Sequence, residues 1–429
     1  MTGKTLPPMQ WVSALSTKAS LEAAVREVVA QAQQQLSAPP DLGLVFISAA
    51  FASEYPRLLP LLHEWLTVPV LVGCSGGGVV GMDPTGTVME MEQKPALNLC
   101  LATLPGVHVK SFRFKDDDLP DLDGPPGAWV DLIGVEPAEE PQFVLLADPF
   151  SSGINDLLQG LDFAYPGAVK VGGLTSASGL QGSSGLFCDR GFHDDGVVGI
   201  ALWGDVVLDA IVAQGCRPIG QPYRVAEGER NIVLKLEEEG DGLTVGESRP
   251  TLEVMQAMLQ DLDESDRKLA QNSLFIGIAK DGFKRRLGQG DFLIRNLLGV
   301  DPRVGAIAIG DRIRPGQRIQ FHLRDAHTSA EDLETLLQQY QTHTQGAETS
   351  PAGALMFACM GRGEGLYQAP NFDSQLLDKH LGGLPVGGFF CNGEIGPIGG
   401  TTYLHGYTSV FGICRRPYEG ETSPVSSPS

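Results

Sequence analysis

The chain has 429 residues, which exceeds a typical single hydrophobic core and favours two domains. Its formal net charge of -21, without a large cluster of lysine and arginine, argues against nucleic acid or an anionic membrane surface as a partner. No segment reaches the roughly 18 apolar residues that span a bilayer, and no basic and apolar leader opens the chain, so we expect a cytoplasmic protein without membrane insertion.

Cysteine and histidine give little support for a metal or redox centre. The seven cysteines make an odd count and none stands in a CxxC pair, and the eight histidines include no HExxH motif. We therefore expect free thiols, no metal site and no cofactor.

The first elements alternate between helix and strand. Residues 15–36 place apolar side chains at helical spacing behind a serine or threonine cap. Residues 42–51 are typical of a buried strand, residues 53–66 repeat leucines at helical spacing, and residues 68–81 form a strand that runs into glycines.

This order recurs along the chain. A strand, a polar corner, a helix, a second strand and a glycine corner return at residues 143–179 and again at residues 353–397, and β-rich sequence follows every glycine corner. The pattern predicts an α/β fold with mixed β-sheets and packed helices, arranged as two related lobes built from this recurring unit.

An acidic segment at residues 235–242 suggests the boundary between the lobes. We therefore predict an N-terminal domain at residues 1–240 and a C-terminal domain at residues 241–416. The polar, Pro/Ser-rich residues 417–429 are predicted to be a disordered tail.

One motif points to catalysis. Residues 73–77 match the GxSxG nucleophile elbow after a strand, which would make Ser75 the nucleophile of a hydrolase. An elbow must open a helix, however, and the following residues are glycines, Pro84 and β-branched residues. A structural turn is the simpler interpretation.

The polar corners of the units suggest a ligand site, because ligands bind at the strand ends of α/β sheets. Arg362 offers a planar fork for a carboxylate, and Glu394 on the neighbouring corner could receive an ammonium group, which together would suit an amino acid. Alternatively, Arg362 and Glu394 pair with each other or with turn carbonyls.

The glycine-rich residues 384–412 hold further polar groups. Cys391, Asn392 and Glu394 lie between glycines, and His405 is the imidazole of the next strand-like run. They either contribute to a ligand site or satisfy backbone groups in a glycine-rich hairpin.

The segments GALMFACMGRGEGLYQ, LPVGGFFCNGEIGPIGG and TTYLHGYTSVFGI resemble the C-terminal FIST domain, of the family named for F-box and intracellular signal transduction proteins. Upstream, LGLVFISAAF, VPVLVGCSGGGVVG and VKVGGLTSAS are similar to the N-terminal FIST domain, so the resemblance covers roughly residues 15 to 415. It implies a sensory module that binds a small ligand, proposed for the family to be an amino acid, and that signals through a partner. No F-box-like leader or kinase, cyclase or methyl-accepting segment is recognisable, so we expect the signal to leave through a separate, unidentified signalling protein.

We therefore predict ligand-binding residues at the corners and no catalytic residues. The predicted set is Gly73, Ser75, Ser151, Cys359, Arg362, Phe389, Asn392, Glu394 and His405. Two alternatives stay open: an interaction scaffold without a ligand, and an enzyme that uses Ser75, Cys74 or Cys391 as nucleophile with His405 as base.

Overall fold

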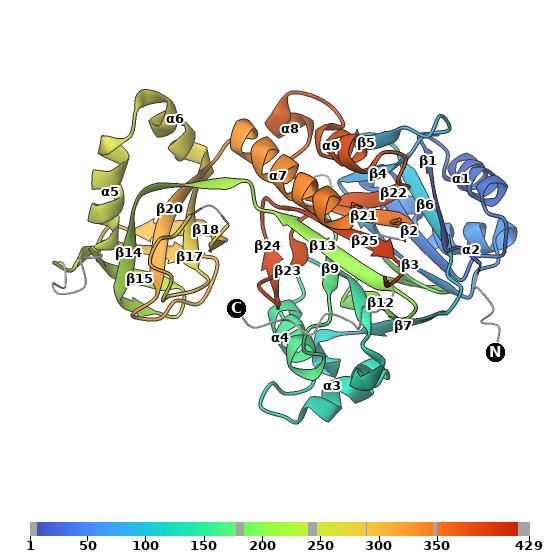
Figure 1. Cartoon of the computed structure of the whole chain (residues 1–429), viewed down its shortest axis with the longest axis horizontal. Helices are drawn as coiled ribbons and strands as arrows, with labels where there is room; N and C mark the ends of the chain where they lie inside the picture. Colours follow the sequence, from blue (N-terminus) through green and yellow to red (C-terminus); the bar gives the residue numbers. More distant parts are fainter. Residues whose placement is uncertain (1–6, 177–183, 239–246, 289, 346–349, 419–429) are drawn as a thin grey trace. The chain divides into compact units, whose positions relative to one another are not determined.

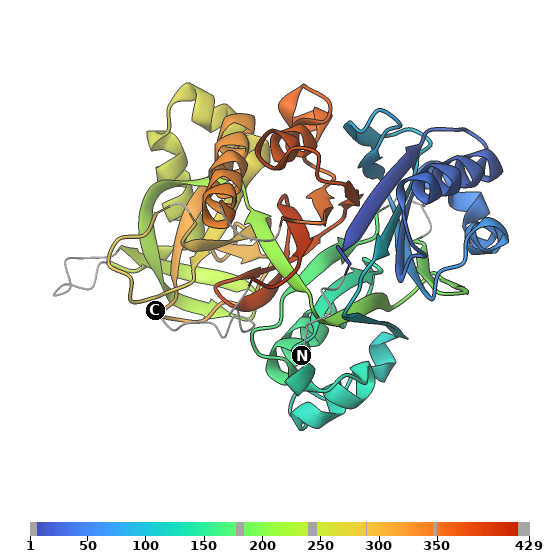
Figure 2. The same ribbon diagram turned by 45° about the vertical axis from the view of Figure 1, so that its right-hand side comes forward.

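The computed structural model describes residues 7–176, 184–238, 247–288, 290–345 and 350–418 (Figure 1; Figure 2). The chain divides into two compact units. Unit 1 combines residues 1–213 with residues 334–429, and unit 2 consists of residues 214–333.

The first compact unit, unit 1, contains all three copies of the recurring motif that the sequence predicted. Each copy consists of a strand, a helix and a second strand. Copy 1 is β2 (Leu42–Ser48), α2 (Tyr55–Trp65) and β3 (Val70–Gly76); copy 2 is β8 (Gln142–Ala147), α4 (Ile154–Ala164) and β9 (Lys170–Leu174); copy 3 is β21 (Gly353–Cys359), α9 (Phe372–Leu381) and β22 (Val386–Cys391). In every copy the two strands pair in parallel and the helix is the crossover. The predicted unit and the mixed α/β class are confirmed.

Each copy forms the centre of a six-stranded mixed sheet. The sheet of copy 1 adds β1 (Gln10–Ser16), β6 (Leu97–Thr103), β10 (Leu186–Cys188) and β11 (Gly191–His193). The sheet of copy 2 adds β7 (Val107–Phe114), β12 (Val197–Gly204), β23 (Glu394–Ile398) and β24 (Thr401–His405). The sheet of copy 3 adds β13 (Val207–Ala213), β25 (Ser409–Arg415), β4 (Gly78–Met82) and β5 (Val88–Glu92).

The hairpins that follow the glycine corners are exchanged among the sheets. Hairpin β4–β5 follows copy 1 but pairs with β22 of copy 3, hairpin β10–β11 follows copy 2 but pairs with β3 of copy 1, and hairpin β23–β24 follows copy 3 but pairs with β9 of copy 2. Each hairpin thus pairs with the sheet of a different copy, and the three exchanges form a closed cycle. This exchange therefore brings residues that are far apart in the sequence together at every corner.

One glycine in the second strand of each copy permits close packing. A Cβ atom added at Gly73, Gly172 or Gly388 would lie 1.8–1.9 Å from a carbonyl oxygen of the parallel neighbour strand. These glycines occupy equivalent register positions, opposite Val45, Leu145 and Met356. The predicted glycine corners thus begin where backbones approach each other too closely for a side chain.

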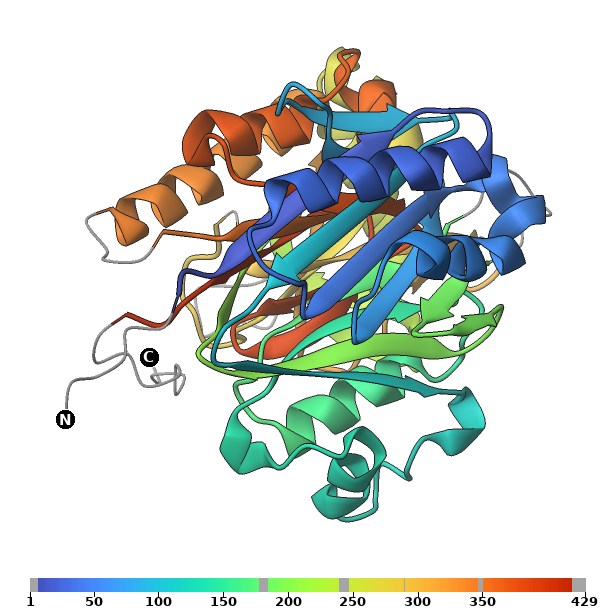
Figure 3. The ribbon, with the colours of Figure 1, turned by 90° about the vertical axis from the view of Figure 1, so that its right-hand side faces the viewer.

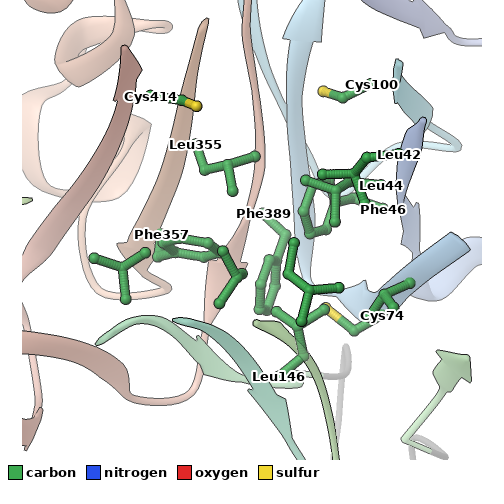
Figure 4. Packing of buried hydrophobic residues seen from close by; sticks show 14 of the residues in the cluster. Leu42, Leu44, Phe46, Cys74, Cys100, Leu146, Leu355, Phe357, Phe389 and Cys414 are labelled. Carbon is green, nitrogen blue, oxygen red and sulfur yellow. The ribbon is translucent and has the colours of Figure 1, made fainter. Parts of the chain in front are cut away.

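The inner faces of the three sheets share one hydrophobic core. Phe389 of copy 3 stacks on Phe46 of copy 1 at 5.5 Å and meets Phe357 edge-on at 5.9 Å, and Leu146 of copy 2 belongs to the same cluster (Figure 4). Helices α1 (Leu21–Gln35) and α2 cover the outer face of the first sheet (Figure 3). Helices α3 (Pro126–Ile133) and α4 cover the second.

Unit 2 is a seven-stranded sheet in which every pairing is antiparallel, in the order β14-β20-β17-β18-β19-β15-β16. Its strands are β14 (Cys216–Glu229), β15 (Ile232–Glu238), β16 (Arg249–Pro250), β17 (Leu274–Ala279), β18 (Phe292–Asp301), β19 (Ala306–Ile309) and β20 (Arg318–Arg324). Helices α5 (Thr251–Asp261) and α6 (Glu264–Ser273) pack on it through an apolar cluster. Helix α7 (Ala326–Thr344) returns the chain to unit 1.

This spatial division differs from the division along the sequence, because the third copy packs with the first two. The predicted boundary at residue 240 lies outside the described residues, as does most of the predicted tail at residues 417–429. Within the described part of the chain, no helix is both long enough and apolar enough to cross a membrane.

Candidate functional site

A cavity of about 520 Å³ lies at the carboxyl ends of the parallel strands of copies 1 and 3. It is lined by Ser48, Ala49, Ala50, Gly77, Gly78, Glu92, Gln93, Lys94, Met360 and Phe390. We call it the corner pocket. Its position follows the general rule that ligands bind outside the carboxyl ends of strands in α/β sheets.

Equivalent strand ends of the three copies are held in the same way. The backbone N–H groups of Ser48, Asp148 and Cys359 each donate to a carbonyl of the neighbouring antiparallel strand or of the loop before it, at 2.9 Å in all three cases. The chain beyond each of these residues therefore leaves its sheet at the same point, which directs the residues after Ser48 and Cys359 into the corner pocket.

Backbone and side-chain contacts among all three copies fix the pocket floor. The N–H of Gly77 donates to the Ser176 hydroxyl at 2.7 Å, and this hydroxyl donates to the Phe390 carbonyl. Ser176 is buried, so these bonds are shielded from water. Gly77 follows β3 of copy 1, Ser176 follows β9 of copy 2 and Phe390 belongs to β22 of copy 3, so these bonds join all three copies at the pocket.

The pocket combines an apolar wall with opposite charges. Ala49, Ala50, Met360 and Phe390 supply apolar surface. The exposed Lys94 makes no ion pair among the residues that the structure describes.

Glu92 supplies the negative charge of the pocket. Its Oε1 accepts the N–H of Glu364 at 2.8 Å. Partial burial raises the pKa of Glu92 above its usual value, and the bond from Glu364 opposes this rise.

None of the nine predicted ligand residues is among the described lining of the corner pocket. Gly73 is buried in β3, and Phe389 belongs to the shared hydrophobic core. Cys359 directly precedes Met360, which does line the pocket. Ser151 lies at the equivalent corner of copy 2, where its hydroxyl donates to Asp116.

Arg362 is fully buried and already engaged with a carboxylate. Its Nε and Nη2 atoms donate to the two oxygens of Asp373 at 2.6 and 3.0 Å, and Nη2 also contacts the Tyr367 hydroxyl at 2.6 Å. The bidentate fork that the sequence suggested exists, but its carboxylate comes from the protein itself. The alternative partner proposed from the sequence was Glu394, and the structure places Asp373 there instead.

Glu394 and His405 face each other across the exchanged hairpin β23–β24. Glu394 is fully buried and its Oε2 accepts the N–H of Thr408 at 3.1 Å, while His405 Nε2 bonds the Gly396 carbonyl at 3.0 Å. Both side chains hold the hairpin. Asn392 is exposed beside it, and its backbone N–H donates to Leu174 at 3.1 Å.

The candidate nucleophiles are inaccessible. Ser75 is fully buried, its hydroxyl accepts the N–H of Gly185 at 3.0 Å, and β3 continues into β4 instead of a helix. Burial raises the pKa of both the Cys74 and the Cys391 thiols well above the usual value, so neither forms a thiolate readily. This geometry does not support the GxSxG elbow or the thiol alternative.

Sequence reasoning missed Glu92 and Lys94, although both follow a β-rich stretch after the first glycine corner. Their only local signal is a pair of opposite charges two residues apart at the end of a strand, which is common on protein surfaces. They reach the pocket because hairpin β4–β5 pairs with β22, and that pairing joins segments that are remote in the sequence.

The regions that match known families and relatives cover most of the chain. Residues 41–239 match the FIST N domain and residues 251–397 match the FIST C domain. An uncharacterized protein of Mycobacterium tuberculosis is 32% identical over 400 residues, which cover 93% of this chain and 98% of that protein. A similar uncharacterized protein of Mycobacterium bovis is 32% identical over 403 residues, covering 94% and 97%. An Arabidopsis thaliana F-box/LRR-repeat protein is 23% identical over 234 residues, which cover 48% of this chain and 42% of that protein.

Proposed function

We propose that this chain is a cytoplasmic sensor of a small metabolite and that it passes its signal to a separate partner protein. The proposal starts from the finding that the chain belongs to the FIST family, which is associated with signal transduction. The observation that carries the proposal is the corner pocket, where strand ends of two copies meet around apolar and charged side chains. Catalysis is not proposed, because Ser75, Cys74 and Cys391 are buried.

The lining favours an amino acid or a related carboxylate as the ligand. The ammonium of Lys94 can bind a carboxylate, and the carboxylate of Glu92 can bind an ammonium group. Met360 and Phe390 can contact an apolar side chain. This assignment replaces Arg362 with Lys94 as the carboxylate-binding group, because Arg362 is occupied by Asp373.

Ligand screening tests the proposal. In a thermal-shift or calorimetric screen of amino acids and small carboxylates, a ligand at a hundred times its Kd should stabilise the protein by about 2.7 kcal/mol. Lys94→Ala should weaken binding of that ligand by about ten- to hundredfold, the value of a lost charge-assisted hydrogen bond. Lys268→Ala is the matched control, because Lys268 is an exposed lysine on α6 of unit 2. No ligand across a broad library, or equal binding by both variants, would contradict the proposal.

A scaffold without a ligand is the second candidate, and exposed aromatic side chains favour it. Phe150 is 86% exposed and Phe163 is 56% exposed, both in copy 2. If Phe150 docks a partner, a pull-down with the ligand-free protein should recover one stoichiometric protein, and Phe150→Ser should abolish the capture. Equal capture by the variant would exclude Phe150 from the interface.

A further inference from the structure

Met360 lines the corner pocket at a position where copy 1 has an alanine. Ser48 and Cys359 end equivalent strands, and the residues that follow them, which are an alanine and Met360, both line the pocket. Met360 also begins the connection from β21 to α9, which contains the short helix α8 (Glu364–Tyr367). The N–H of Met360 donates to the carbonyl of the last residue of β22 at 3.0 Å, so its backbone is fixed. Its side chain is 44% exposed, so a ligand can reach it.

The Met360 side chain rests on the glycine corner of copy 1. A Cβ atom added at Gly77 would lie 2.8 Å from Met360 Cε and 3.1 Å from Met360 Sδ. These distances are shorter than the roughly 3.5 Å at which carbon atoms make favourable contacts, so a side chain at Gly77 has to displace Met360. Gly77 is held in place, because its N–H donates to the buried Ser176 hydroxyl at 2.7 Å. The missing side chain at Gly77 therefore provides the seat of Met360.

Phe390 lies against the next glycine but is held more firmly. A Cβ atom added at Gly78 would lie 2.8 Å from Phe390 Cδ2. The Phe390 carbonyl accepts the Ser176 hydroxyl, and the residue is only 2% exposed. Met360 is unbranched and adapts its shape through three rotatable bonds. Of the two large apolar side chains in the lining, Met360 is therefore the one that can move.

The charged part of the lining is anchored by hydrogen bonds. The Ser48 N–H donates to the Ala96 carbonyl at 2.9 Å, and the Ser48 hydroxyl accepts the Ala96 N–H at 3.0 Å. Glu92 Oε1 accepts the N–H of Glu364 at 2.8 Å. These contacts hold the chain on both sides of Lys94, so the charged groups of a ligand meet a fixed part of the pocket.

We propose that Met360 is the specificity-determining residue of the corner pocket and selects ligands by the size of their apolar group. The inference rests on the proposed function, because it names the feature of an amino acid or related carboxylate that the pocket distinguishes. Glu92 and Lys94 bind the charged groups that such ligands share, whereas Met360 contacts the apolar group in which they differ. Compared with the alanine at the equivalent corner of copy 1, Met360 disfavours a bulky apolar group.

Paired ligands measure this selection. L-Alanine and L-phenylalanine share their charged groups and differ by one phenyl group, and propionate and phenylpropionate form the matching pair without the ammonium group. Calorimetric titration of the full-length protein gives the ratio of the two Kd values in each pair. Met360→Ala should shift this ratio about tenfold in favour of the bulky ligand, because the truncation removes a contact with the small ligand and makes room for the phenyl group.

Gly77→Ala tests the same contact from the other side. The φ angle of Gly77 lies outside the left-handed region, so the backbone accepts an alanine. The added methyl group should push Met360 into the pocket and shift the ratio about tenfold toward the small ligand. In the Met360→Ala background the same substitution should have much less effect, because the side chain that it displaces is gone. Gly127→Ala is the matched control, because Gly127 is exposed on α3 and no atom lies within 4 Å of the added Cβ.

Two results would overturn the role of Met360. One is a ratio in Met360→Ala that equals the wild-type ratio, and the other is an effect of Gly77→Ala that is equally large without Met360. Urea denaturation checks that each variant is folded, and Met360→Ala decides alone if Gly77→Ala unfolds. If neither pair binds the wild type, the proposed ligand class and the role of Met360 fall together. If the pairs bind with an unchanged ratio in the variant, only the role of Met360 falls.

Discussion

Replacing Arg362 with alanine should lower the free energy of unfolding by about 3 to 5 kcal/mol, the cost of leaving one partner of a buried ion pair without its counter-charge. Arg362 and Asp373 have side-chain exposures of 0% and 1%, so water cannot take over the lost interaction. Urea denaturation at neutral pH measures the change as a lower midpoint with an unchanged slope.

Two further variants separate charge from geometry at this position. Arg362→Lys keeps the positive charge but cannot reproduce the two parallel hydrogen bonds to Asp373, so it should remain destabilised. The double variant Arg362→Leu with Asp373→Leu removes both charges and should lose less stability than Arg362→Ala alone. If Arg362→Ala instead unfolds at the wild-type midpoint and loses ligand affinity, the arginine binds ligand, as the sequence first suggested.

Asp162→Ala should be comparably destabilising, because it leaves the buried ammonium of Lys170 without its counter-charge. Lys170 is fully buried, and its Nζ donates to Asp162 at 2.8 Å. Asp162 also accepts the backbone N–H of Thr402 at 2.7 Å, so it ties the exchanged hairpin β23–β24 to copy 2. We expect a loss of about 3 to 5 kcal/mol in urea denaturation.

The loss in Asp162→Ala should shrink as the pH rises. Burial lowers the pKa of Lys170 below 10.5, so the unfolded chain binds more protons between the two values and stability increases with pH there. Without Asp162 the pKa of Lys170 falls further and the window widens toward neutral pH. Lys170→Met should cost less, because Asp162 keeps its bonds to Thr402. A loss in Asp162→Ala that is equal at pH 7 and pH 10 would contradict this account.

Local sequence patterns were sufficient for the elements and for their repetition. The alternation of apolar strands, amphipathic helices and glycines predicted all three copies, and the corners that follow Ser48, Asp148 and Cys359 prove equivalent in the structure. These features depend on periodicity and on backbone conformation, which act over a few residues.

The candidate site was predictable only in its location at the strand ends. The sequence indicated Arg362 and Glu394, yet Arg362 bonds Asp373 and Glu394 holds the hairpin. A side chain in a corner can turn toward a ligand or toward the protein, and the difference is decided by partners that approach from other segments.

The sequence by itself determined the family, the mixed α/β class and the recurring unit of this protein, because each depends on residue patterns within short segments of the chain. Only the tertiary structure decided that three copies share one core, that their hairpins are exchanged, and that β5 carries Glu92 to the corner pocket. The physical reason is that strand pairing between remote segments leaves no local signal, since any β-prone strand with the right register and shape can occupy the free edge of a sheet.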